Sequence, residues 1–184
     1  MAEYYLISQL PSLDGIGENT PLPITEERFL ELCHRFSGKN VQKELDDLKL
    51  IPSRDCERST VALIDAWNEG EQNLRLALGK VRADKLNKHF DMDVSVSSGL
   101  MQIARTAVEF ESPMEAELFL NRYRLDFLES LRPINPFAES YLFYYLLKLK
   151  LLSRIRKFSE ESGRSAYQNI YHSIMDGDSL EAEQ

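Results

Sequence analysis

One stretch near the C-terminus constrains the fold more than any other part of the chain. Residues 134–158 read INPFAESYLFYYLLKLKLLSRIRKF, in which an almost entirely apolar run gives way to five basic residues between positions 148 and 157. A membrane-spanning helix needs about 20 predominantly apolar residues, and the basic residues interrupt this run too early. The stretch therefore predicts the central helix of a protein core rather than a membrane span, with neighbouring helices covering most of its circumference.

The basic residues of this helix are its main polar feature. At 100° per residue, Lys150, Arg154 and Lys157 fall within about 60° of one another on the helical wheel. Cations also suit the negative C-terminal end of a helix dipole. Such an exposed stripe is most often a solvated face, and the alternative is a docking surface for an acidic partner. The candidate partner-docking residues are Lys148, Lys150, Arg154, Arg156 and Lys157.

Cap signals predict where several helices begin. Thr25 precedes two glutamates and is placed to cap a helix that follows. The sequence SPME at 112–115 combines an N-cap serine, a proline at the first helical position and the glutamate of a capping box. Asn135 and Pro136 repeat the cap-plus-proline arrangement and predict the start of the core helix. We expect Tyr141, Tyr144, Trp67 and Leu74 to lie in the core.

Glycines predict where helices end or weaken. Gly38 is a candidate C-cap, and Ser162 with Gly163 is expected to end the core helix. A helical pattern that begins near residue 60 contains Gly70 and Gly79. Each costs about 1 kcal/mol relative to alanine in a helix interior, which allows a bend or break near either one.

These patterns together define the fold class. Only the first ten residues and residues 93–97 look strand-like, and residues 4–13 fit the first turn of a helix as well. We therefore predict an all-α protein, a compact bundle of about six or seven helices in which a short N-terminal segment could be a strand. A single helical domain is expected over residues 1–175, followed by an acidic, disordered tail at 176–184.

Charge and leader signals restrict the partners and the compartment. The net charge of -8 repels phosphate backbones, so nucleic acid is not expected as a partner. The start MAEYYLISQLP has no basic residue before its short apolar run, and it is not read as a secretory signal. Cys33 and Cys56 are then expected to be reduced thiols in a cytoplasmic protein.

No motif of an enzyme or a metal site stands out. The chain lacks phosphate-binding and nucleophile-elbow glycine motifs, and we predict no catalytic residues, no cofactor and no metal. The sequence DMDVSVSSG resembles the start of a calcium loop, but Val96 stands where glycine is needed. Cys33 and His34 are neighbours that point to different helix faces. The helical acids are expected to be solvated or capping residues, namely Glu69, Glu71, Glu109, Glu111, Glu115 and Glu117.

Three segments resemble a known family. They are YYLISQLPSL with the following ITEERFLELC, DAWNEGEQNLRLALGKVRADKL at 65–86, and PFAESYLFYYLLKLKLLSRIRKFSEESGRSAYQNI at 136–170. They resemble a short bacterial family encoded among V-type ATPase genes, which is similar to the C-type subunit of archaeal-type rotary ATPases, known as the d-type subunit in eukaryotes. The match rests on Tyr-Leu starts followed by Glu-rich, Leu-Arg stretches such as Glu71, Asn73, Leu74 and Arg75. In the second copy, Lys150, Leu151 and Leu152 stand where the pattern has a glutamate.

The resemblance implies a non-catalytic subunit or an accessory or assembly factor of a rotary ATPase. The implied partners are other protein subunits of the central stalk or the membrane rotor ring, which would place the protein peripherally on the inner membrane through a complex. Two alternatives stay open at the level of sequence. One is a helical adaptor or regulator unrelated to ATPases. The other is an enzyme that uses scattered Glu, His34 or Tyr residues, which a deep pocket holding two or more acids with perturbed pKa values would support.

Overall fold

The computed structural model describes residues 2–16, 20–53, 58–90, 96–157, 167–168 and 170–171. The helices of the described residues are α1 (Ala2–Gln9), α2 (Glu26–Phe36), α3 (Lys39–Asp47), α4 (Ala62–Lys85), α5 (Ser98–Glu109), α6 (Pro113–Ser130) and α7 (Glu139–Lys157). These residues contain no strand. The predicted all-α class, with about six or seven helices, is confirmed. The expected tail at 176–184 lies outside the described residues.

Helix α7 is the centre of the larger of two hydrophobic clusters. It contacts α2, α3, α4 and α6, and most of its side chains from Leu142 to Leu151 are buried. Trp67 and Tyr144 join this cluster from the expected core set, and Tyr141 packs against it half-buried. The expectation of a core helix is therefore confirmed. A second cluster, which contains Leu74, forms between α4, α5 and α6.

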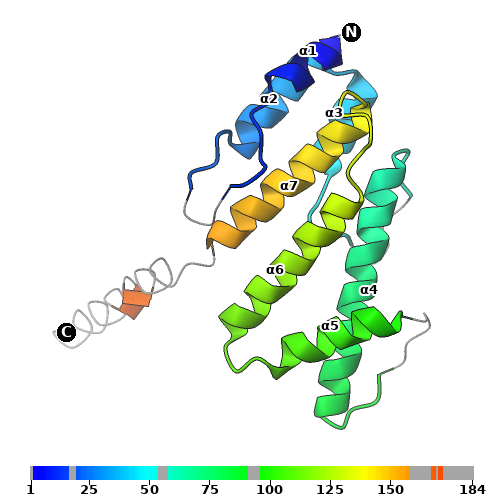
Figure 1. Cartoon of the computed structure of the whole chain (residues 1–184), viewed down its shortest axis with the longest axis vertical. Helices are drawn as coiled ribbons and strands as arrows, with labels where there is room; N and C mark the ends of the chain where they lie inside the picture. The colour runs from blue at the N-terminus through cyan, green and yellow to red at the C-terminus, as the bar shows by residue number, and fades with distance from the viewer. Residues whose placement is uncertain are drawn as a thin grey trace, which may run out of the picture.

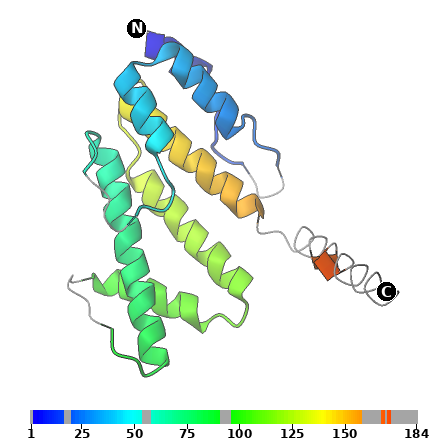
Figure 2. The same ribbon diagram turned by 180° about the vertical axis from the view of Figure 1, so that it is seen from behind.

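The helices are arranged around α7 and α6. In Figures 1 and 2, α1 and α2 lie along one side of α7, and α6 lies along the other. Helix α4 runs beside α6, and α5 crosses the far half of α4. None of the helices in the described part of the chain is both long enough and apolar enough to cross a membrane, as the sequence predicted for the stretch that became α7.

The N-terminal segment is a helix, which corrects the strand-like alternative. Leu6 and Ile7 are consecutive and both are buried, at 2% and 7% exposure. A strand would direct consecutive side chains to opposite faces, so burying both on one side favours a helix. Residues beyond α1 are held to α7, because the Tyr145 hydroxyl donates to the Pro11 carbonyl at 2.9 Å. Of the other strand-like segment, residues 93–95 lie outside the described residues, and 96–97 lead into α5.

Two predicted N-caps are confirmed, and the predicted C-cap of α2 is corrected. The Thr25 hydroxyl accepts from the backbone of Arg28 at 3.2 Å, and the Ser112 hydroxyl accepts from the backbone of Glu115 at 3.4 Å. Gly38 is not the C-cap of α2; Ser37 has that place, and Gly38 is the N-cap of α3 with an ordinary negative φ.

The core helix begins later than predicted. Asn135 and Pro136 form a turn rather than its first residues: the Asn135 side chain accepts from the backbone of Phe137 at 3.0 Å, and α7 starts at Glu139. The side chain of Asn135 therefore closes a separate turn, four residues before the first residue of α7. The predicted helix end at residues 162–163 lies outside the described residues.

Helix α4 runs without a break through both of its glycines. A Cβ atom at Gly70 would lie 2.3 Å from the ring of Phe127 on α6. A Cβ atom at Gly79 would lie 3.0 Å from the ring of Phe90. The glycines are therefore used for close packing of aromatic rings against α4 and not for a bend.

Candidate functional site

The structure places most of the five predicted docking cations in contacts within the chain. Lys148 is the clearest case, because its side chain is 9% exposed and donates to Asp14 and Glu129. Burial alone would lower the pKa of Lys148, but hydrogen bonds to Asp14, Glu129 and Tyr144 outweigh it and hold the pKa above its usual value. The hydrogen bond from Lys148 lowers the pKa of Asp14 in turn. Lys148 therefore fastens the loop after α1 to α7 and is not on an exposed stripe.

The other four cations differ in their surroundings. Lys150 forms an ion pair with Glu26 in the first turn of α2, and Arg154 pairs with Glu117 on α6. Arg156 donates to the backbone carbonyl of Thr20. Lys157 is exposed at the end of the described part of α7. The docking role of these residues stays a prediction, and Lys157 presents its charge most openly.

A buried ion pair between α4 and α6 was missed by the sequence interpretation. Arg124 donates to both carboxylate oxygens of Glu71, at 2.9 and 3.0 Å, and the two residues are 7% and 3% exposed. The expectation of a solvated Glu71 is therefore wrong. Arg124 also donates to Asn121 at 3.1 Å and to Glu117 at 3.4 Å. Glu117 is shared with Arg154, so the network connects α4, α6 and α7. The available signal was the position of Glu71, between the buried Trp67 and Leu74 on the same helix.

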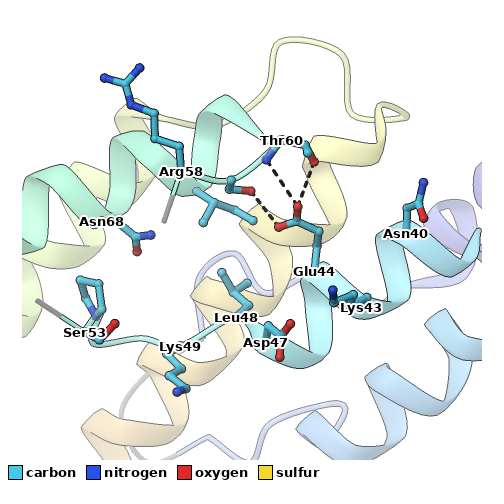
Figure 3. Close-up of a pocket in the computed structure, with 13 residues that line it drawn as sticks. Asn40, Lys43, Glu44, Asp47, Leu48, Lys49, Ser53, Arg58, Thr60 and Asn68 are labelled. Atoms are coloured by element: carbon cyan, nitrogen blue, oxygen red, sulfur yellow. Dashed lines mark hydrogen bonds between the residues drawn. The ribbon is translucent and has the colours of Figure 1, made fainter. Parts of the chain in front are cut away.

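A polar pocket of about 550 Å³ lies between α3 and the start of α4 (Figure 3). Its central carboxylate is Glu44, which accepts from the hydroxyl groups of Ser59 at 2.8 Å and Thr60 at 2.9 Å. Burial would raise the pKa of Glu44, but these hydrogen bonds outweigh it and lower the pKa. In Figure 3, Arg58 and Lys49 extend away from Glu44 and from each other. Glu44 is thus an ionised group that joins two segments, which makes it a weak proton acceptor.

Thiol and imidazole groups do not converge on a metal site in the described part of the chain. Cys33 is fully buried, whereas the neighbouring His34 is half exposed and contacts both oxygens of Asp46, at 2.9 and 3.0 Å. The prediction that these neighbours point to different faces is confirmed. Most of the calcium-like segment, residues 91–95, lies outside the described residues.

Exposed aromatic and aliphatic side chains gather where the start of α1 meets the loop before α7. The rings of Tyr4 and Phe137 stack with centroids 4.2 Å apart, although Tyr4 is 58% and Phe137 40% exposed. Ile134, in the same loop, is fully exposed. We call Tyr4, Ile134 and Phe137 the aromatic patch. Beside it, Tyr5 packs on Phe36 with centroids 5.8 Å apart. The sequence interpretation assigned no role to this patch, and its signal was the repeated tyrosine of the first helix.

Comparisons of the chain with protein-family models, with curated proteins and with solved structures find no match. The resemblance to the family of C-type rotary ATPase subunits therefore stays a prediction that rests on the three sequence segments.

Proposed function

We propose that this protein is a non-catalytic helical subunit or accessory factor of a V-type rotary ATPase, which acts by protein–protein contact through the aromatic patch. The observation that carries the contact surface is the stacked Tyr4–Phe137 pair beside the fully exposed Ile134. Stacked aromatic rings and a bare aliphatic side chain expose apolar area that a partner would bury, and aromatic residues are frequent hot spots of interfaces.

The identity of the partner comes from the resemblance of three segments to the C-type subunits of rotary ATPases. The proposed partners are stalk or rotor-ring subunits, which would hold a cytoplasmic protein peripherally at the inner membrane. The polar pocket favours an enzyme less, because its central carboxylate is ionised and already accepts from Ser59 and Thr60. Proteins that act through contacts need an accessible surface rather than a proton acceptor, and the aromatic patch supplies one.

The test is recovery of the tagged protein from its own cells in mild detergent, followed by mass spectrometry. We compare the wild type with the double variant Ile134→Asp/Phe137→Ser. Leu86→Asp is the matched control, because Leu86 is also a large exposed apolar residue, at 66% exposure, and lies at the end of α4. We expect stalk and ring subunits with the wild type and the control, and a loss of about tenfold or more with the double variant.

Each other outcome contradicts part of the proposal. The protein that is recovered with the wild type and lost with the double variant could be unrelated to ATPases. The patch would then still be a contact surface, and the role of an adaptor would replace the ATPase role. Unchanged recovery of ATPase subunits with the double variant would move the contact elsewhere. Lys157→Glu then tests the basic-residue prediction. Lys157 is suited to this test because it forms no ion pair with another described residue, whereas Lys150 and Arg154 each form one.

A further inference from the structure

A second hollow, of about 200 Å³, lies between α6, α7 and the loop after α1. Its lining is mainly apolar and includes Leu118 and Leu125 from α6 and Leu152 and Ile155 from α7. We call it the α6–α7 groove. It is smaller than the pockets that hold typical small-molecule ligands, which measure about 300–1,000 Å³. Its size suits one or two apolar side chains of a helix or peptide.

Positive charge borders this groove. Arg122 and Arg156 line it together with the apolar residues. Arg122 is exposed on α6, and no ion pair joins it to another described residue. Arg156 reaches the Thr20 carbonyl with one nitrogen of its guanidinium group. A guanidinium group offers five N–H donors, so Arg122 can bind a carboxylate, and the charge of Arg156 adds to the positive potential beside it. The groove therefore fits an occupant with apolar anchors and adjacent acids.

The C-terminal part of this chain has that composition. Tyr167, Ile170, Tyr171 and Ile174 follow the spacing of one face of a helix. Tyr167, Ile170 and Tyr171 are 69%, 59% and 50% exposed, and the rings of the two tyrosines stack with centroids 6.3 Å apart. The sequence after Met175 is DGDSLEAEQ, with four acids and no basic residue. On a protein with a net charge of -8, two arginines beside an apolar hollow are a favourable place for such a segment.

The position of the groove makes the contact easy to form within one molecule. The described part of α7 ends at Lys157, two residues after Ile155 of the groove wall. Ten residues of extended chain span up to about 33 Å, which exceeds the length of α7, about 28 Å at 1.5 Å per residue. Two parts of one chain that are separated by so few residues can meet at an effective concentration in the millimolar range, so a contact with a dissociation constant near roughly 100 μM would be occupied about ten to one.

We propose that the C-terminal segment 167–184 docks into the α6–α7 groove of its own chain. Ile170 and Ile174 are the apolar anchors, and the acids after Met175 lie beside Arg122 and Arg156. This inference does not depend on the ATPase role, because it concerns only two parts of the same chain.

Paramagnetic relaxation in the full-length protein tests this contact. A nitroxide is attached at Ser179→Cys in a chain that carries Cys56→Ser. Cys33 can stay, because burial raises the pKa of its thiol to about 12 and keeps it unreactive. We expect the methyl signals of Leu118, Leu125, Leu152 and Ile155 to lose most of their intensity. The methyl signals of Leu6 and Leu45 serve as internal references, because α1 and α3 lie toward the other end of α7 (Figures 1 and 2).

Two variants and one mixture decide between the outcomes. Arg122→Glu or Ile170→Asp should restore the signals of the groove, whereas Arg105→Glu, an exposed arginine on α5, should not. Equal broadening of groove and reference signals would overturn the proposal. Broadening in a mixture of nitroxide-labelled and isotope-labelled molecules, at the level seen within one molecule, would overturn docking within the chain and assign the groove to the tail of a second copy.

Discussion

Replacement of Arg124 by methionine should destabilise the protein more than most single substitutions. Methionine has a similar length and a similar helix propensity, so the change mainly removes the guanidinium group. Glu71 is then left 3% exposed without its cationic partner and the two hydrogen bonds of 2.9 and 3.0 Å. Removal of one partner of a buried ion pair costs about 3–5 kcal/mol, because the remaining charge stays buried and uncompensated.

The reverse substitution should cost less. In Glu71→Leu, Arg124 keeps Asn121 and Glu117, at 3.1 and 3.4 Å, as acceptors. The long arginine side chain can also move its charged end toward water. The double variant Glu71→Leu/Arg124→Met buries no charge at these positions. Replacement of a buried pair by apolar residues is often neutral or stabilising, so the double variant should be more stable than Arg124→Met alone.

Urea unfolding followed by circular dichroism measures these differences. A loss of about 3–5 kcal/mol corresponds to a lower urea midpoint by about 1 M or more and to a melting temperature lower by about 6–20 °C. Arg105→Met, at an exposed position on α5, is the control and should stay within about 0.5 kcal/mol of the wild type. A cost below about 1 kcal/mol for Arg124→Met, or a double variant as unstable as the sum of both single variants, would refute this reasoning.

Two further predictions concern packing and pH. Gly70→Ala should lower the free energy of unfolding by about 1–2 kcal/mol, because the new Cβ atom would lie 2.3 Å from the Phe127 ring. This cost should exceed the gain from the higher helix propensity of alanine. In the same urea assay, Gly79→Ala should cost less, because its Cβ atom would lie 3.0 Å from the nearest ring atom. Lys148→Met should remove a stability contribution that is complete between pH 4.5 and 10.5, as urea unfolding at a series of pH values can show. The contribution of the wild type should fall below that window, as the lowered pKa values of its carboxylate partners are crossed, and above it, as the raised pKa of Lys148 is crossed. A difference between wild type and variant that does not change with pH would contradict the second prediction.

Local signals in the sequence predicted the elements well. Thr25 and Ser112 cap their helices because each hydroxyl group, followed by acids, accepts from a backbone N–H group of the first turn. This local interaction does not depend on the tertiary fold. The apolar run after residue 140 had to be buried on most sides, and it is. The errors came where a local signal had two uses. Asn135 caps a turn rather than α7. The apolar start of the chain fits both a strand and a helix by its sequence, and the burial of Leu6 and Ile7 in the core favours the helix.

The periodicity of the sequence does not predict which residues the charged side chains contact. A helical wheel gives the face of a residue, but Lys148 meets Asp14 from 134 positions away, and Arg124 meets Glu71 from 53 positions away. Lys148 was nevertheless predictable in part, because it lies about 160° from Lys150 on the wheel, within the apolar arc. A cation on that arc needs an acidic partner, because burial without one would lower its pKa. The same argument applies to Glu71, which lies on the buried side of α4. It predicts a buried partner for Glu71 rather than a solvated position. A charge that falls among buried positions therefore indicates an internal ion pair before it indicates a docking surface.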